Sequence, residues 1–467
     1  MRRFFTKPEY VFLVPALVFG TLSALLMPQL IVNDENMHFI RSYELSELEF
    51  GHSCTIPVEI KERGFFAIYA QKQPDYSFNA KSIDMNNQIA TDCGTATSYN
   101  PLLHFPQTIG IIFAKLVWPS TGAMILFGRL ANVLLFALAL FFIIRKAKVG
   151  KWVIVVIGLL PMMLHMAGSL SGDTVNNIVI IGFISFLFNL FIQKTMMTKK
   201  QLIMLLGLSA LLAVTKLPNL ALLLLVLFLP GRVLPIITIR QWRIPKTLFR
   251  FIAAGICGVA AITVVLAWST IYNAPVIGSS NIDNPIIEAP YKLFPVLFNT
   301  YINPEIMFEG VSYSDWLMRG VVGSFASFEY YLPYSLVMML IALILLVGFR
   351  RDDSEDKLMK PVLKKLTPVT LVSLGIIIVA ITYGLYTAWA LQPFGLGKDA
   401  QYALGLQGRY FTPLILLLIP LMIFLRRYVS VNVKPGATTG VIVFTVTSFT
   451  LAFYLMQTIS YALALLG

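Results

Sequence analysis

The topology of this chain depends on FPQTIGIIFAKLVW, residues 105–118. Four of its apolar side chains recur with the i, i+3, i+4, i+7 spacing of one helical face: Ile109, Ile112, Phe113 and Leu116. As a helix the segment reaches roughly 21 Å, which is short of the about 30 Å hydrocarbon core of a bilayer. We therefore expect residues 105–118 to lie in the membrane interface without spanning it.

The composition around this segment is that of a membrane protein. Of 467 residues, 57% are hydrophobic and 13% are charged, whereas soluble proteins average about 45–50% apolar and about 25% charged residues. Apolar stretches long enough to cross a bilayer recur along the chain. A water-soluble enzyme and a disordered scaffold are excluded, and the net charge of +13 indicates membrane topology, not nucleic-acid binding.

We expect an all-α protein with eleven spans, beginning with an uncleaved span at about 10–32. The other ten are predicted at 121–144, 152–168, 174–193, 201–215, 218–230, 251–272, 333–349, 366–390, 410–425 and 438–463. This assignment places 24 of the 36 basic residues in inner loops and 18 of the 23 acidic residues outside, as the positive-inside rule requires. The sequence thus predicts a multi-pass protein of the bacterial cytoplasmic membrane with a cytoplasmic N-terminus.

We expect a single membrane domain that comprises residues 1–467. Its two large loop segments, 33–120 and 273–332, are predicted on the extracytoplasmic side. No nucleotide-binding motif occurs, and the inner loops are too short for a nucleotide-binding domain. Any chemistry is therefore expected on the outer face, with a substrate that arrives already activated. Cys54 and Cys93 share the first segment and are able to pair if it is extracytoplasmic.

The first candidate site is Asn33-Asp34-Glu35-Asn36-Met37-His38, directly after the first span, with Arg41 on roughly the same helical face. A carboxylate at the membrane surface can act as a general base, and Asp34, Glu35 and His38 can hold a divalent cation such as Mg²⁺ or Mn²⁺. The alternative is a helix N-cap formed by Asn33 or Asp34. The sequence alone favours neither.

Three basic residues lie at the outer ends of predicted spans: Arg129, Lys216 and Arg409. Positive groups at that depth can bind a lipid phosphate or pyrophosphate. The alternative is that the long side chain only extends to the lipid headgroups. We favour this alternative for Lys216, and we favour a functional role for Arg129 and Arg409. Arg129 is also expected to have a partner, because a lone charge at its depth costs about 2.5–3.5 kcal/mol.

Two further acidic residues are secondary candidates. Asp173 follows Ser171-Gly172 at an outer loop, where capping of the next helix is an adequate alternative. Glu329 precedes Tyr330-Tyr331, in a group of interfacial aromatic residues, and is able to face a cleft.

The order of several short motifs resembles a known family. They are Asp34-Glu35-x-x-His38, Tyr99-Asn100-Pro101, Gly128-Arg129-Leu130, Ser171-Gly172-Asp173, Lys216 with Pro218, and Gln407-Gly408-Arg409-Tyr410-Phe411-x-Pro413. Over about residues 10–425 the chain resembles bacterial membrane proteins of the family called domain of unknown function 2142. That family resembles the GT-C glycosyltransferases, which take sugar from a polyprenyl-phosphate carrier at the outer membrane face.

The resemblance implies a GT-C-like fold whose first outer loop carries interfacial helices and a catalytic acid, here Asp34 with Glu35 beside it. We expect a glycosyltransferase that moves sugar from a lipid-linked donor to a cell-envelope acceptor, which is a polysaccharide, a teichoic-acid-like polymer or a lipid. The resemblance assigns no phosphate-binding residues. Arg129, Lys216 and Arg409 are therefore phosphate-binding candidates only because of their depth at the outer ends of the spans. The alternatives are a transporter or flippase, or a polymerase or ligase, of lipid-linked saccharides.

Overall fold

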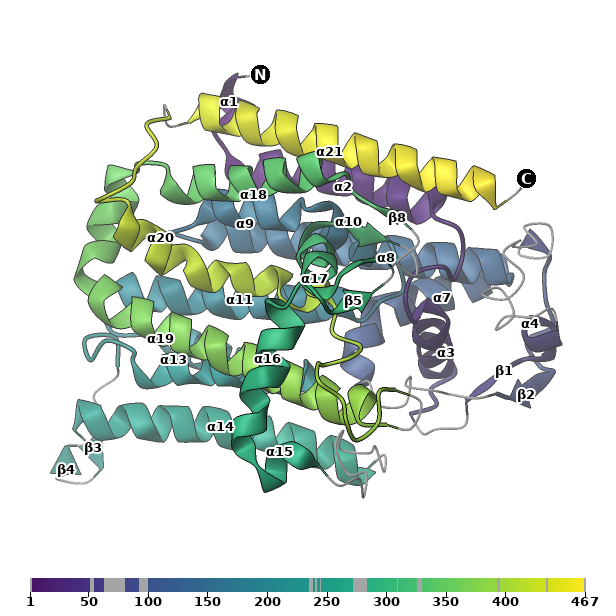
Figure 1. Ribbon diagram of the computed structural model, residues 1–467, viewed down its shortest axis with the longest axis horizontal. Coiled ribbons are helices and arrows are strands. Elements are labelled where there is room, and N and C mark those ends of the chain that lie inside the picture. Colours follow the sequence, from purple (N-terminus) through teal and green to yellow (C-terminus); the bar gives the residue numbers. More distant parts are fainter. Residues whose placement is uncertain are drawn as a thin grey trace.

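Long helices lie side by side in the computed structural model and form one bundle (Figure 1). The structure describes residues 2–50, 54–62, 80–91, 100–234, 238–239, 242–243, 245–271, 284–308, 310–325, 330–392, 395–433 and 436–465. The N-terminal α1 (Arg2–Phe5) and α2 (Pro8–Leu26) pack against the C-terminal α21 (Ala437–Ala464). The two ends of the chain therefore contribute neighbouring helices.

Six helices among the described residues are long and apolar enough to cross a membrane. They are α2, α8 (Thr121–Lys146), α11 (Asp173–Ile192), residues Arg250–Ala267 of α14 (Lys246–Ile271), α19 (Asp353–Leu385) with the π-helical turn η5 (Tyr386–Ala390), and α21. They overlap the spans predicted at 10–32, 121–144, 174–193, 251–272, 366–390 and 438–463, although α2 already ends at Leu26 and α19 already begins at Asp353. The chain is a multi-pass membrane protein.

Shorter helices occupy the other five predicted spans. They are α9 (Lys151–Gly158) with α10 (Pro161–Ala167), α12 (Lys199–Val214), η3 (Leu217–Leu223) with α13 (Leu224–Leu227), α18 (Tyr334–Phe349), and η7 (Thr412–Leu418) with α20 (Ile419–Leu425). Pro161, Pro218 and Pro413 each stand in the first two positions of a new helical segment, because proline cannot supply the N–H of a continuing helix. The predicted count of eleven spans is not confirmed.

Residues 105–118 form α7 (Phe105–Val117), which follows the 3₁₀ turn η2 (Pro101–His104). The four apolar residues of the predicted face are exposed by 39–80%. The opposite face packs on α8, so closely that a Cβ at Gly110 would lie 2.2 Å from the carbonyl oxygen of Phe127. The amphipathic helix is confirmed, and its interfacial depth stays a prediction.

The remaining elements lie mostly at the two ends of the bundle. At one end are α3 (Glu35–Ser46), β1 (Thr55–Pro57), α4 (Val58–Glu62) and β2 (Gln88–Ala90), and at the other is the hairpin of β3 (Thr238–Ile239) and β4 (Trp242–Arg243) (Figure 1). The second predicted outer segment contains α15 (Pro285–Glu288), η4 (Pro290–Lys292), α16 (Leu293–Tyr301), β5 (Met307–Phe308), β6 (Val311–Ser312), α17 (Tyr313–Val322), β7 (Ser324–Phe325) and β8 (Tyr330–Tyr331).

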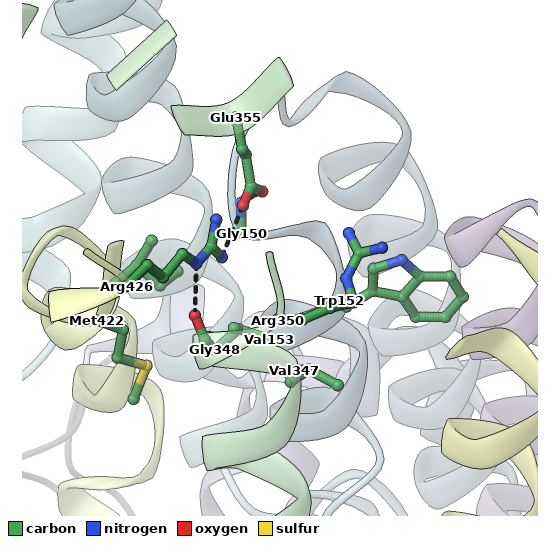
Figure 2. A pocket seen from close by; sticks show the side chains of 10 residues that line it. Gly150, Trp152, Val153, Val347, Gly348, Arg350, Glu355, Met422 and Arg426 are labelled. Atoms are coloured by element: carbon green, nitrogen blue, oxygen red, sulfur yellow. Dashed lines mark hydrogen bonds and ion pairs between the residues drawn. The ribbon is translucent and has the colours of Figure 1, made fainter. Parts of the chain in front are cut away.

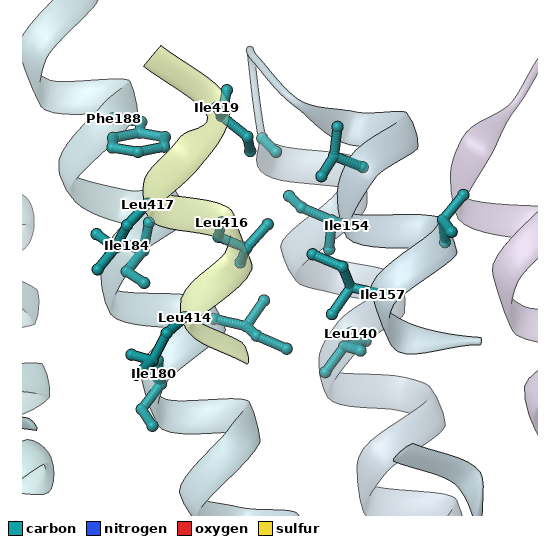
Figure 3. Packing of buried hydrophobic residues seen from close by; sticks show 14 of the residues in the cluster. Leu140, Ile154, Ile157, Ile180, Ile184, Phe188, Leu414, Leu416, Leu417 and Ile419 are labelled. Atoms are coloured by element: carbon teal, nitrogen blue, oxygen red, sulfur yellow. The ribbon is translucent and has the colours of Figure 1, made fainter. Parts of the chain in front are cut away.

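The core lies around α11, whose apolar window is 78% buried, whereas that of α14 is 17% buried. Figure 3 shows η7 between α11 and α9, with its leucines against aliphatic side chains of both helices. Burial of these side chains fixes η7 at the centre of the bundle. The turn η6 (Gly408–Tyr410), which immediately precedes η7, is thereby held at the end of α11.

The two cysteines among the described residues, Cys54 and Cys257, differ in oxidation state. Cys54 is disulfide-bonded, and Cys257 is a buried free thiol. The predicted partner of Cys54, Cys93, lies outside the described residues.

Candidate functional site

Four charged side chains from four separate parts of the sequence meet at the end of the bundle that carries α3. Asp34 precedes α3, Asp173 begins α11, Lys216 precedes η3, and Arg409 lies in η6. Arg409 Nη2 is 3.8 Å from Asp34 Oδ2, and Arg409 Nε is 3.2 Å from Asp173 Oδ2. Lys216 Nζ is 3.1 Å from Asp173 Oδ1. We call these four residues the outer cluster.

Asp34 is the most accessible member of the outer cluster. Its side chain is 45% exposed, while that of Arg409 is 7% exposed. Asp34 occupies the N-cap position of α3 but makes no capping hydrogen bond with its side chain. Its backbone φ of 62° lies in the left-handed region, which aspartate adopts more readily than most residues. The carboxylate is directed toward Arg409 instead of the helix end, so the capping interpretation does not describe Asp34.

Asp173 is a bridge between the two cations. The N-cap position of α11 is Gly172, and the Asp173 carboxylate contacts Lys216 through one oxygen and Arg409 through the other. Its side chain is 14% exposed. A carboxylate held in this way fixes the positions of both cations, because each ion pair restricts one long side chain.

Lys216 is held by two partners. Its ammonium lies 3.3 Å from the ring centroid of Tyr410 and is paired with Asp173. The side chain remains 29% exposed. Burial and, to a smaller extent, the charge of Arg409 lower the pKa of the ammonium to about 8, although Asp173 acts in the opposite direction. The favoured prediction, that Lys216 extends to the lipid headgroups, does not match this geometry.

A close backbone contact positions Arg409. A Cβ at Gly408 would lie 2.1 Å from the carbonyl oxygen of Leu317 and 2.4 Å from the backbone nitrogen of Val321, both in α17. Only glycine allows η6 to approach α17 this closely. In the Gln407-Gly408-Arg409-Tyr410 motif, Gly408 therefore makes the close contact with α17 and places the neighbouring Arg409 in the outer cluster.

Glu35 and Arg129 form a separate, fully buried ion pair. Arg129 Nη2 lies 2.6 Å from Glu35 Oε2 and Nε lies 2.8 Å from Oε1, and the two side chains are 1% and 0% exposed. Arg129 also donates to the carbonyl oxygens of Ala24, Met27 and Pro28, at the end of α2. The prediction of a partner for Arg129 is confirmed. Its five hydrogen bonds make it a structural residue, and it does not join the outer cluster.

His38 makes a buried pair with a residue that the sequence analysis did not single out. Its Nδ1 is 2.9 Å from Nε2 of His104. Burial lowers the pKa of both imidazoles below 6.5, so both rings are neutral at pH 7. Arg41 lies on the same helix, is fully buried and pairs with Glu44 at 3.2 Å.

The predicted cation ligands do not converge. Glu35 is bound to Arg129, and His38 is bound to His104. No group of three or more potential ligands occurs among the residues that the structure describes. Asp34, Glu35 and His38 therefore do not fit the Mg²⁺ or Mn²⁺ site that the sequence suggested.

Buried amides hold the loop that presents Asp173. Gln107 donates to the carbonyl oxygens of Leu170 and Ser171 at 3.1 and 3.0 Å. Asn132 donates to the carbonyl oxygen of Ser169 at 2.8 Å. Sequence reasoning missed both residues, although an amide inside an apolar helix is a signal, because a buried polar group needs partners.

Glu329 lies outside the described residues. The other candidates divide into two groups. The outer cluster contains Asp34, Asp173, Lys216 and Arg409, whereas Glu35, Arg129, His38 and Arg41 have buried partners of their own.

A second group of charges lies at a small pocket lined by residues of α9, α18, α19 and α20 (Figure 2). Arg426 contacts Glu355 and Asp356, each at 2.9 Å, and donates to the carbonyl oxygen of Gly348. Glu355 also accepts from the backbone N–H of Gly150 at 2.6 Å. These groups join four helices and leave the Arg426 side chain 6% exposed, which is typical of a structural junction.

Comparison with known proteins identifies one family. The family DUF2142, described as a predicted membrane protein, matches residues 17–418. No curated protein and no solved structure matches the chain. The match covers nearly the whole bundle and includes all four residues of the outer cluster. The chain therefore belongs to the DUF2142 family of predicted membrane proteins.

Proposed function

We propose that the protein is an integral-membrane glycosyltransferase that uses a polyprenyl-phosphate or polyprenyl-pyrophosphate sugar at the outer face of the bacterial cytoplasmic membrane. The observation that carries this proposal is the contact of Arg409 with both Asp34 and Asp173 in a cluster where Asp34 is 45% and Lys216 is 29% exposed. An accessible carboxylate beside two cations suits acid–base chemistry next to a phosphate. Resemblance to the GT-C enzymes supports the reaction class.

In the proposed reaction, Asp34 accepts the proton of an acceptor hydroxyl. The hydroxyl oxygen forms a bond to the anomeric carbon of the donor, and the bond from that carbon to the phosphate oxygen breaks. The carrier phosphate leaves with the electron pair of that bond. Arg409 and Lys216 stabilise its negative charge, and Asp173 keeps both cations in place.

The orientation of the protein is part of the proposal. The disulfide at Cys54 supports an oxidising compartment for the end of the bundle that carries the outer cluster. The basic loops of the sequence support a cytoplasmic location for the opposite end. A membrane-embedded donor reaches the cluster from the bilayer, and a cell-envelope acceptor reaches it from the aqueous side.

The test is transfer by purified protein reconstituted with a panel of polyprenyl-phosphate and polyprenyl-pyrophosphate sugars and a cell-envelope extract as acceptor. We expect release of the sugar-free carrier by the wild type and by the control Asp399→Asn, whose carboxylate is exposed on another outer loop. We expect carrier release by Asp34→Asn to be slower by about 10²–10⁴-fold. Movement of intact donor across the vesicle membrane without carrier release would contradict the proposal and favour a flippase.

A further inference from the structure

The second predicted outer segment contains α16, a helix that exposes apolar side chains and directs its polar side chains toward the protein. On and beside α16, five large apolar or aromatic side chains are exposed: Ile287, Tyr291, Phe294, Phe298 and Ile302 are 71%, 71%, 76%, 52% and 65% exposed. The charged side chains of Glu288 and Lys292, just before α16, are exposed as well. Phe294 and Phe298 lie four residues apart on one face of α16, and they are flanked by Tyr291 in η4 and by Ile302 at the C-cap of α16. Such a contiguous apolar face marks an interaction surface.

The polar side chains of α16 face the protein. Asn299 donates to the carbonyl oxygen of Gln401 at 3.1 Å, and the Thr300 hydroxyl accepts from the backbone N–H of Ala403 at 3.0 Å. The hydroxyl of Tyr301 is 2.8 Å from that of Thr382 in α19. Because hydrogen bonds to the bundle fix the polar face, the aromatic face cannot turn inward without breaking them.

The helix α16 is hydrogen-bonded to a helix that is long and apolar enough to cross a membrane. Thr382, the partner of Tyr301, lies in one of the six membrane-spanning helices. α14 is another of these helices, and Ile262 and Leu266 near its end are 55% and 56% exposed. In Figure 1, α16 runs across the long axes of α14 and α19. A short amphipathic helix that crosses the spans in this way has the geometry of a helix lying in the bilayer interface.

We propose that the aromatic face of α16 is a membrane-docking surface whose partner is bilayer lipid, so that the second outer segment rests on the membrane. The sequence predicts residues 273–332 on the outer side, and this proposal adds a lipid contact for part of that segment. It does not depend on the proposed glycosyltransferase activity.

The test uses the full chain in phosphatidylcholine nanodiscs, in a Cys257→Ser background that leaves the Cys54 disulfide intact. An environment-sensitive fluorophore is attached at Phe298→Cys or, as the matched control, at Glu305→Cys, an exposed acidic position in the same segment. Fluorescence is measured with doxyl-labelled phosphatidylcholine and, separately, with iodide.

We expect the label at Phe298→Cys to lose most of its fluorescence to the doxyl lipid and little to iodide, and the control label to show the opposite. If iodide quenches both labels alike, the face is open to water and the proposal is wrong. If neither quencher reaches the label at Phe298→Cys, protein covers the face and lipid is not its partner. A Phe294→Cys label supplies an independent position on the same face, and we expect it to agree with Phe298→Cys.

Discussion

Asp34 and Glu35 are neighbours in the sequence and carry the same functional group, yet they lie in opposite environments. Glu35 is fully buried and receives two hydrogen bonds from Arg129, at 2.8 and 2.6 Å. Asp34 is 45% exposed and lies 3.8 Å from Arg409. Each acid faces its own arginine, but only one of the two pairs has an accessible carboxylate.

From this difference we expect a structural role for the Glu35–Arg129 pair and a catalytic role for the Asp34–Arg409 pair. The Arg129 guanidinium joins the end of α2 to the start of α3 through five hydrogen bonds. Arg409 instead shares its charge with Asp34 and Asp173 beside the partly exposed Lys216. A substrate can reach the second group without first unfolding the protein. We expect mutations to distinguish the two pairs by what is lost, which is stability at Glu35 and Arg129 and activity at Asp34 and Arg409.

The largest expected effect on stability is at the buried pair. Replacing Arg129 by alanine leaves the Glu35 carboxylate buried without its partner, which typically costs about 3–5 kcal/mol. We expect Arg129→Ala to unfold at a clearly lower temperature or to fail to accumulate, as followed by thermal unfolding in detergent. The double change Glu35→Met with Arg129→Met should recover part of the loss, because no buried charge remains. A wild-type melting temperature for Arg129→Ala would contradict the assignment.

At the neighbouring acid, Asp34→Asn should reduce sugar transfer by about 10²–10⁴-fold, the usual contribution of a general base. Its free energy of unfolding should change by less than about 0.5 kcal/mol, as is usual for an exposed side chain. Steady-state transfer and thermal unfolding of the same preparation measure both quantities. Unchanged transfer with unchanged stability would remove the role given to Asp34.

Moving Arg409 without removing it should give an intermediate effect. The added methyl group in Gly408→Ala meets the α17 backbone, and a shift of about 1 Å in a catalytic group can cost about 10²-fold in rate. Gly207→Ala is the matched control, since no atom lies within 4 Å of its added Cβ. We expect the control to transfer sugar normally. Equal activity of the two variants would show that the contact with α17 does not position Arg409.

The smallest expected effect is a pH dependence at Lys216. With its pKa lowered to about 8, the ammonium is charged below that pH and loses its charge above it. Affinity for inorganic pyrophosphate should therefore fall as the pH rises through about 8, while Lys216→Arg should keep its affinity, because arginine stays charged. Calorimetric titrations between pH 7 and 9 measure this. A flat profile for the wild type would show that the Lys216 charge does not contribute to anion binding.

The sequence predicted at which ends of the spans the charged candidate residues lie, but not which of their side chains meet. The positions of Asp34, Lys216 and Arg409 at one predicted face follow from span boundaries and the charge of the loops. The choice between Asp34 and Glu35 depends on the left-handed backbone at Asp34 and on which arginine each carboxylate faces. Neither can be deduced from residue spacing. Likewise, Gly408 became informative only when α17, from a distant part of the chain, was seen against it.

The predicted count of eleven spans is not confirmed, because five of the predicted spans hold shorter helices. Hydropathy registers apolar length, whereas a proline inside an apolar stretch can end one helix and start another. Pro161 and Pro413 begin new helical segments inside stretches that are apolar throughout. Proline does not end every helix, because α2 continues through Pro15 and α19 continues through Pro361 and Pro368. Both remain among the six helices that are long enough to cross a membrane.

The most direct test of the central claim, that the outer cluster is accessible from outside the cell, is thiol labelling in intact cells. Asp34→Cys and Arg351→Cys, whose native side chain is 65% exposed near the opposite end of the bundle, are each treated with a membrane-impermeant maleimide in a Cys257→Ser background. We predict labelling of Asp34→Cys in intact cells and of Arg351→Cys only after the membrane is permeabilised. Labelling of Arg351→Cys in intact cells, with Asp34→Cys protected until permeabilisation, would contradict the account.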